Sequence, residues 1–208
     1  TVVSEFSPAY PVQAPDVSYG LVENIVQYPL LVQGAPARAL VPLDDLLEPP
    51  SLRDAPRPWT LEAFDDSAWQ SGVTGIGFGY PHVIGLDVSY MRNVNETVYI
   101  RIPFVVEDPS AFRTLTLRMQ FDDGMIAYLN GHEVARANAP EPTAETWNSG
   151  APTNYPNTRL VVPVDFTIRQ VDYLHVGTNL LAVQGLNFGV ANPDLLVVPE
   201  LLANLAGA

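Results

Sequence analysis

The chain has 208 residues, of which 47% are hydrophobic, so it is long enough for one large or two small domains with a sizeable core. Its 20 prolines and 14 glycines leave little room for long helices, and 10 basic against 23 acidic residues give a net charge of −13 that repels nucleic acid and anionic membranes. Cysteine is absent, which excludes disulfides, Cys-based zinc sites and a thiol nucleophile.

The first part of the chain is rich in proline and weakly patterned. Residues 1–33 form a short block that is too small to bury a core alone. Residues 34–58 are predicted to be a Pro-rich linker or long surface loop, with a first strand expected near Leu40-Val41. From Trp59 to the end, the pattern becomes regular and predicts one folded unit, residues 59–208.

The regular part predicts strands that alternate apolar and polar residues. They are expected at 97–106, at 115–136 in three pieces, at 160–168, and as a last pair at 179–186 and 195–202. Pro103 indicates an edge or a bulge in the first of these, and a helical turn is expected at 172–175. Residues 137–158 show almost no periodicity and are predicted to be a long loop.

Two turn signals divide the 115–136 region. Asp123-Gly124 and Asn130-Gly131 both combine residues that tolerate positive φ, as tight turns between antiparallel strands require. Many short strands with such turns predict an all-β fold, an antiparallel β-sandwich of the jelly-roll type.

Four segments, in chain order, resemble the galactose-binding-like jelly-roll domains. They are Phe64-Asp-Asp-Ser-Ala-Trp69, Tyr99-Ile-Arg-Ile-Pro-Phe104, Tyr128-Leu-Asn-Gly-His-Glu-Val134 and Gly177-Thr-Asn-Leu-Leu-Ala-Val183. The chain is similar to the sugar-binding domain of family 2 glycoside hydrolases. It is also similar to a module of large secreted bacterial proteins, in which Asp-Asp-Gly precedes Tyr-Leu-Asn-Gly. The resemblance covers residues 59–202 and implies a sandwich that binds carbohydrate or another surface partner without catalysis.

A second, shorter resemblance concerns residues 1–20. Glu5-Phe-Ser-Pro8 and Asp16-Val-Ser-Tyr-Gly20 are similar to the end of a lamin-tail-type β domain. This resemblance implies a piece of a modular protein that is secreted or held at the cell surface. The first six residues have neither a basic start nor a signal-peptide core, and no apolar run reaches the roughly 20 residues that span a bilayer. We therefore expect a mature fragment with no membrane insertion.

Aromatic and amide side chains in three irregular segments are the candidate ligand-binding residues. Sugars stack on aromatic rings, while amides and carboxylates hold their hydroxyls. The candidates are Tyr80, His82 and Tyr90; Trp147, Asn148, Asn154 and Tyr155; and Asn187, Phe188 and Asn192. Loops from distant positions cluster at one end of a jelly roll, so a joint site is expected. The alternative is that Trp147 and Tyr155 only pin a long loop to the body.

Asp122 and Asp123 raise the question of carboxylate catalysis. General acid–base pairs must flank one bond, but adjacent strand residues point to opposite faces. Asp123 is therefore predicted to act in a turn with Gly124. Asp122 is predicted to contact a polar ligand or to bond loop amides.

The acidic residues at both ends of the regular part suggest a different site. Asp65 and Asp66 either cap a turn, with Trp69 packed into the sandwich, or hold the structural Ca²⁺ that the resemblance implies. Asp194 and Glu200 are then the expected partners, and no other cofactor is expected. Glu200 lies in an apolar run and needs a partner, which Arg101 or Arg136 would supply equally well.

Other chemistry has little support in the sequence. The three histidines are isolated, and no serine sits in a nucleophile elbow. The segment Gly75-Ile-Gly-Phe-Gly79 lacks the spacing and the βαβ context of a dinucleotide loop. Its glycines are predicted to allow bulges or close strand approach.

Three functions are compared. The leading hypothesis is a non-catalytic carbohydrate-binding module of a larger secreted or surface protein, with polysaccharide and neighbouring domains as partners. The second is a structural or protein-interaction sandwich with no soluble ligand. The third, a carboxylate hydrolase, needs two carboxylates about 5–10 Å apart across a cleft, and the chain offers no convincing pair.

Overall fold

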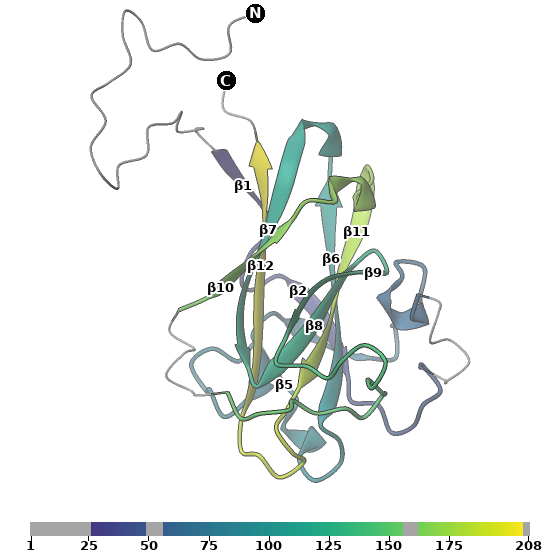
Figure 1. Cartoon of the computed structure of the whole chain (residues 1–208), viewed down its shortest axis with the longest axis vertical. Coiled ribbons are helices and arrows are strands. Elements are labelled where there is room, and N and C mark those ends of the chain that lie inside the picture. The colour runs from purple at the N-terminus through teal and green to yellow at the C-terminus, as the bar shows by residue number, and fades with distance from the viewer. Residues whose placement is uncertain (1–25, 49–55, 156–161, 206–208) are drawn as a thin grey trace, which may run out of the picture.

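The computed structural model describes residues 26–48, 56–155 and 162–205 (Figure 1). Within these residues, two β-sheets pack face to face, and the strand pairs are antiparallel except β4 with β5. The first sheet has the order β10 (Val164–Ile168), β7 (Phe112–Asp122), β12 (Leu195–Leu205), β4 (Ile76–Phe78), β5 (Leu86–Asp87), and β1 (Val26–Leu31) also pairs with β12. The second has the order β3 (Gln70–Val73), β2 (Pro36–Leu40), β6 (Thr97–Val106), β11 (Gly177–Leu186), β8 (Gly124–Leu129), β9 (His132–Ala137). The all-β sandwich expected from the sequence is confirmed.

The core lies between the sheets and follows the predicted alternation. Leu115, Leu117, Met119 and Phe121 on β7 face Val98, Ile100, Ile102 and Phe104 on β6 across the core, and all eight are buried. Burial of such side chains stabilises a fold by about 1.5–3 kcal/mol each. Pro103 is exposed and lies beyond Arg101, the last β6 residue that pairs with β2. One side of β6 is therefore an edge there, as a residue without an N–H requires.

The two predicted turns of the 115–136 region have different outcomes. Asn130 and Gly131, with φ of 48° and 90°, join β8 to β9 as a two-residue hairpin, as predicted. Asp123-Gly124 does not make a hairpin. It carries the chain from β7 in one sheet to β8 in the other, because β7 pairs with β10 and β12 while β8 pairs with β9 and β11.

The domain boundaries expected near residues 33 and 58 need correction. The β1 strand pairs with β12, and β2 pairs with β3 and β6, so residues 26–31 and 36–40 belong to the two sheets of the sandwich. The lamin-tail-like residues 1–20 lie outside the described residues.

In the described ranges, four short 3-10 helices connect the strands: η2 (Pro58–Thr60), η3 (Ser89–Met91), η4 (Pro109–Ala111) and η6 (Val171–Tyr173). The last is close to the helical turn expected at 172–175. The loop predicted at 137–158 begins one residue later, because Ala137 ends β9; over its described part, residues 138–155, there is no strand, as predicted. None of the helices in the described ranges is long and apolar enough to cross a membrane.

The outer face of the second sheet is covered by a second apolar layer. Its buried members are Trp59, Trp69, Tyr99, Ile126, Tyr128, Ala151, Leu180, Ala182 and Leu186. The residues between β2 and β3 and those after β9 supply Trp59, Trp69 and Ala151 to this layer. Trp69 is buried, as predicted, but it packs in this outer layer and not in the core between the two sheets. Loops thus seal this face of the sandwich.

Candidate functional site

At one end of the sandwich, groups from two loops bond Asp123, which is fully buried. Its Oδ1 accepts a hydrogen bond from the Tyr155 backbone N at 2.7 Å, and its Oδ2 accepts one from the Phe188 backbone N at 2.7 Å. The side-chain amide of Asn192 reaches the same Oδ2 at 3.5 Å, and Asn138 donates to the backbone oxygen of Asp123. The residue predicted to act in a turn thus holds the 138–155 loop and the 187–194 loop together.

The neighbouring Asp122 fixes the β4–β5 loop. The Tyr80 hydroxyl donates to its Oδ2 at 2.6 Å. The pKa of Asp122 is raised to about 7, chiefly by burial; the Tyr80 hydrogen bond opposes this shift, and the carboxylates of Asp123 and Asp194 add to it. Burial and the same carboxylates raise the pKa of the Tyr80 hydroxyl. Asp122 is itself fully buried, so it positions Tyr80 in this structure and does not face solvent.

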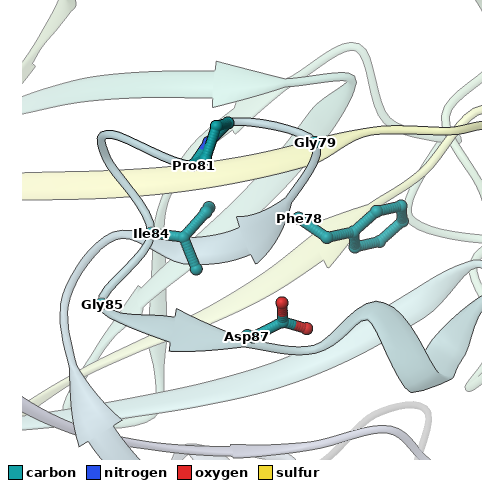
Figure 2. Close-up of a pocket in the computed structure, with 6 residues that line it drawn as sticks. All are labelled: Phe78, Gly79, Pro81, Ile84, Gly85 and Asp87. Carbon is teal, nitrogen blue, oxygen red and sulfur yellow. The ribbon is translucent and has the colours of Figure 1, made fainter.

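An open pocket of about 420 Å³ lies beneath the same loop (Figure 2). Its lining consists of Phe78, Gly79, Pro81, Ile84, Gly85 and Asp87. In Figure 2, Pro81 and Ile84 on the loop and Asp87 on β5 surround the same space. This volume lies within the ~300–1,000 Å³ range of ligand pockets, which are mostly apolar with a few polar groups.

The predicted ligand residues divide into two groups. Five of them converge at this end: Tyr80, Asp122, Tyr155, Phe188 and Asn192. The Tyr155 ring lies 4.9 Å from the Phe121 ring between centroids, so Tyr155 also pins its loop to the body, as the alternative interpretation holds. Phe188 is 43% exposed and available to a ligand.

The remaining candidates are placed around this group. His82 and Asn154 are exposed, Tyr90 is 51% exposed on η3, and Trp147 is half-buried in a turn. Asn148 bonds Thr146 within the same turn. Asn187 is fully buried, and its side-chain oxygen and nitrogen have no partner among the described residues. Among the described residues, no contact joins His82, Tyr90 or Trp147 to Asp123 or to the groups that bond it.

The four carboxylates expected to share a calcium ion do not gather. Asp66 pairs with Arg38 at 3.3 Å and Arg101 at 2.7 Å. Asp65 accepts from the Ser67 backbone N, which is the turn cap of the alternative interpretation. Asp194 lies near Asp122. Within residues 26–48, 56–155 and 162–205, no three Asp, Glu or His side chains form a group that could hold a metal. The geometry therefore does not support this calcium site.

Glu200 is also partnered differently from expectation. Arg101 forms an ion pair with Asp66, and Arg136 forms ion pairs with Glu133 and Glu145. Glu200 stands opposite Arg118 in the β12–β7 register and is only partly buried. Side chains alternate along β12, so Glu200 lies on the outer face and its charge stays hydrated.

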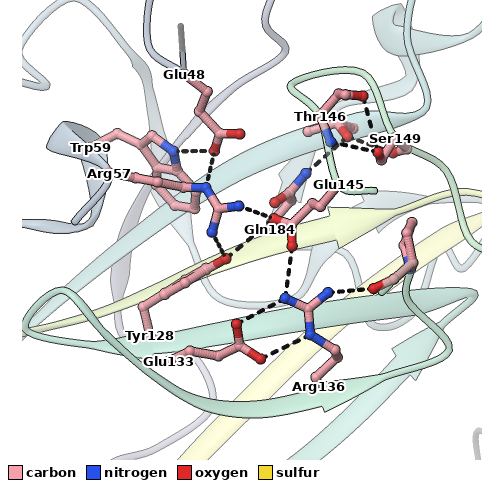
Figure 3. Close-up of polar contacts among 12 residues, drawn as sticks. Glu48, Arg57, Trp59, Tyr128, Glu133, Arg136, Glu145, Thr146, Ser149 and Gln184 are labelled. Atoms are coloured by element: carbon pink, nitrogen blue, oxygen red, sulfur yellow. Dashed lines mark hydrogen bonds and ion pairs between the residues drawn. The ribbon is translucent and has the colours of Figure 1, made fainter. Parts of the chain in front are cut away.

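A polar network lies in the cover of the second sheet (Figure 3). Arg57 pairs with Glu48 at 3.0 Å and with Glu145 at 2.6 Å, and it also bonds the Tyr128 hydroxyl. Arg136 reaches the other Glu145 oxygen at 2.7 Å. The Glu145 side chain is fully buried between the two guanidinium groups. Burial raises the pKa of Glu48 against the opposing effect of Arg57.

The sequence analysis missed the pocket residues Phe78, Pro81, Ile84 and Asp87. Two signals were present. The glycines at 75, 77, 79 and 85 let the backbone approach its neighbours closely. At Gly77, for example, a Cβ would lie 1.9 Å from the Leu195 backbone oxygen. This confirms the close strand approach predicted for them. Asp87-Val-Ser89 is an Asx turn, since Asp87 Oδ1 accepts from the Ser89 backbone N at 2.7 Å.

Known structures share this fold. The chain matches two structures of Bacteroides uniformis β-glucuronidases, with TM-scores of 0.50 and 0.51, 14% identity, and coverage of 86% of this chain and 18% of each of theirs. A glycosyl hydrolase family 2 member from Bacteroides cellulosilyticus gives a TM-score of 0.47 at 14% identity, covering 86% of this chain and 20% of that one. No family model and no curated protein matches the sequence.

The chain therefore spans about a fifth of the length of the solved structures that it matches. At this identity the likeness shows the fold alone: a β-sandwich like one present within those larger glycosidases.

Proposed function

We propose that this chain is a non-catalytic carbohydrate-binding module of a larger secreted or surface protein. One observation carries the proposal: distant loops bring Tyr80, Phe188 and Asn192 to one end of the sandwich, and the loop that carries Tyr80 lines an open pocket. Aromatic faces with a few polar groups on a rigid support are what recognition of sugar rings requires. Asp123 and Asp122 supply that support by holding three loops.

The absence of catalysis is part of the proposal. The adjacent carboxylates Asp122 and Asp123 are both fully buried, and both bond groups of the chain itself. A glycosidase pair must reach the bond on either side with carboxyl groups about 5–10 Å apart. Two inaccessible neighbours on one strand do not meet that requirement.

The test is affinity electrophoresis of the chain through gels that contain different neutral, amino and acidic polysaccharides. We expect retention in at least one gel, and weaker retention of Phe188→Ala. The matched control is Tyr28→Ala, which removes a similarly exposed aromatic (57%) from β1, far from the loop end (Figure 1). Equal loss in both variants, or no retention in any gel, would contradict the proposal.

A second candidate is a protein-interaction domain. Exposed apolar side chains continue from Phe188 to Val190, and the Val190 backbone oxygen accepts from the Asn93 backbone N at 2.7 Å, beside Val94. Exposed apolar groups at one place often mark a contact with another protein. Sedimentation of the chain with and without added neighbouring domains discriminates, because a docking domain associates with them without any sugar.

A further inference from the structure

The pocket beneath the β4–β5 loop is held in shape by the backbone. Gly75 O accepts from Gly85 N at 2.8 Å and from Leu86 N at 3.2 Å, and Gly77 O accepts from Val88 N at 3.1 Å. At the tip of the loop, Tyr80 O accepts from the N atoms of Val83 and Ile84. Both ends of the loop are tied to β4, so the pocket exists before a ligand arrives, and little ordering entropy opposes binding.

The lining has two chemical parts. Phe78, Pro81 and Ile84 provide apolar surface that matches the C–H face of a sugar ring. Asp87 provides the acidic group: Ser89 N holds its Oδ1, while no described residue bonds its Oδ2. An ionised carboxylate oxygen only accepts hydrogen bonds, so the ligand must donate there, from a hydroxyl or an ammonium group.

Charge around the pocket disfavours anions. The carboxyl groups of Asp122 and Asp194 lie near Tyr80 of the same loop, and both raise the pKa of its hydroxyl. The chain has no lysine, so arginine is its only permanently charged side-chain cation. Five described arginines are ion-paired away from this loop: Arg38, Arg57, Arg101, Arg118 and Arg136. A carboxylate ligand placed against Asp87 would meet a like charge.

We infer that this pocket binds a single neutral or amino-sugar ring, which stacks on Pro81 and Ile84 and donates to Asp87 Oδ2, and that it rejects uronic acids. The inference rests on the proposed function and deepens it, because it names the ring class and the residue that selects it. Tyr80 is a positioning residue: its bond to Asp122 holds the loop that carries Gly79 and Pro81.

The experiment measures binding by calorimetry to three oligosaccharides that differ only in the terminal ring: neutral hexose, amino sugar and uronic acid. We expect the first two to bind at least about tenfold more tightly than the third, a difference of about 1.4 kcal/mol. Asp87→Asn keeps an oxygen for Ser89 N but removes the charge. It should weaken the first two ligands about tenfold and remove most of the discrimination against the third.

The matched control is Asp108→Asn. Asp108 Oδ1 accepts from Ser110 N at 2.9 Å in the same kind of Asx turn, on η4 between β6 and β7. Its substitution changes the net charge equally and should leave all three affinities unchanged. Ile84→Trp fills the pocket without altering charge and should abolish binding of all three ligands. It replaces Asp87→Asn as the test variant if Asp87→Asn does not fold.

The outcomes separate the two claims. Equal or tighter binding of the uronic acid, or unchanged binding by both Asp87→Asn and Ile84→Trp, overturns the pocket inference and leaves carbohydrate binding standing. No binding of any of the three ligands by the wild type, together with no retention in any polysaccharide gel, overturns both.

Discussion

The two loop-covered regions of this sandwich use their charged residues in opposite ways. Over the second sheet, Glu145 is enclosed between Arg57 and Arg136, and aromatic rings fill the remaining space. At the loop end, the neighbouring carboxyl groups Asp122, Asp123 and Asp194 have no arginine among the groups that shift Asp122. In the first region, ion pairs and aromatic packing join the loops to the sheet. The second holds its loops through neutral donors and leaves a pocket open.

The difference indicates where a ligand is expected. Buried charges are stable when an opposite charge accompanies them, as in the cover of the second sheet. Carboxyl groups that lie near one another raise each other's pKa, and they favour a ligand that donates hydrogen bonds over an anionic one. The same acidic chain thus uses the ion pairs of Glu145 to build structure, and it gathers the carboxyl groups of Asp122, Asp123 and Asp194 at the candidate site.

The largest effect is expected for Glu145→Ala. It removes the fully buried partner of two partly buried guanidinium groups, and breaking a buried ion pair costs about 3 kcal/mol or more. Urea unfolding gives the free-energy difference. The control is Glu133→Ala, which removes the more exposed partner of Arg136 and should cost less than about 1 kcal/mol. Similar costs for both would contradict the assignment of Glu145 as the central residue of the network.

Asp123→Ala should have the next largest effect. It removes the acceptor of two backbone N–H groups, those of Tyr155 and Phe188, and should lower the free energy of unfolding by about 2 kcal/mol. Because those groups anchor two loops, limited proteolysis should then cleave within 138–155 and 187–194. Cleavage elsewhere, with these loops still protected, would show that Asp123 does not hold them.

A pH effect follows from Asp122. Its pKa is about 7 in the folded chain, above the usual value of 3.8. The folded state therefore binds this proton more tightly than the unfolded state does, and the stability it contributes is lost as pH rises through about 7. Between pH 5 and pH 8 we expect a loss of about 2–3 kcal/mol that Asp122→Asn does not show. Parallel pH profiles for the two proteins, from urea unfolding, would refute this.

The smallest effect on stability is expected for Phe188→Ala. The ring is 43% exposed, so the free energy of unfolding should change by less than about 0.5 kcal/mol, while sugar binding weakens. Thermal unfolding and gel retention of the same sample measure both. A large loss of stability would mean that the ring is part of the fold and not of the site.

Local sequence was sufficient where neighbouring residues decide the structure. Asn130-Gly131 adopts positive φ and closes the hairpin that its residue types favour. Asp123-Gly124 carries a similar signal, yet the chain changes sheets there. That outcome depends on pairing of β7 with β10 and β12, whose residues are distant in sequence.

The candidate site, like the fold, was predictable only in part from the sequence. Loops of a jelly roll meet at one end, which brought Tyr80 and Phe188 together as expected. The ion pairs were not predictable. Asp66 meets two arginines because Arg38 and Arg101 stand opposite each other in the β2–β6 register, and register is not visible in local patterns. The pocket was missed because it forms where glycines let the chain fold back on itself, and such a segment shows no alternation of apolar and polar residues.

The most direct test of the central claim is an NMR titration of the isotope-labelled chain with a methyl glycoside of a neutral hexose. Carbohydrate binding at the loop end predicts concentration-dependent shifts of the backbone amides of residues 79–88 and 187–194. Amides beside Glu145 and Tyr128 in the covered region should stay unchanged. Shifts centred on the covered region or on β1, with residues 79–88 unaffected, would contradict the claim.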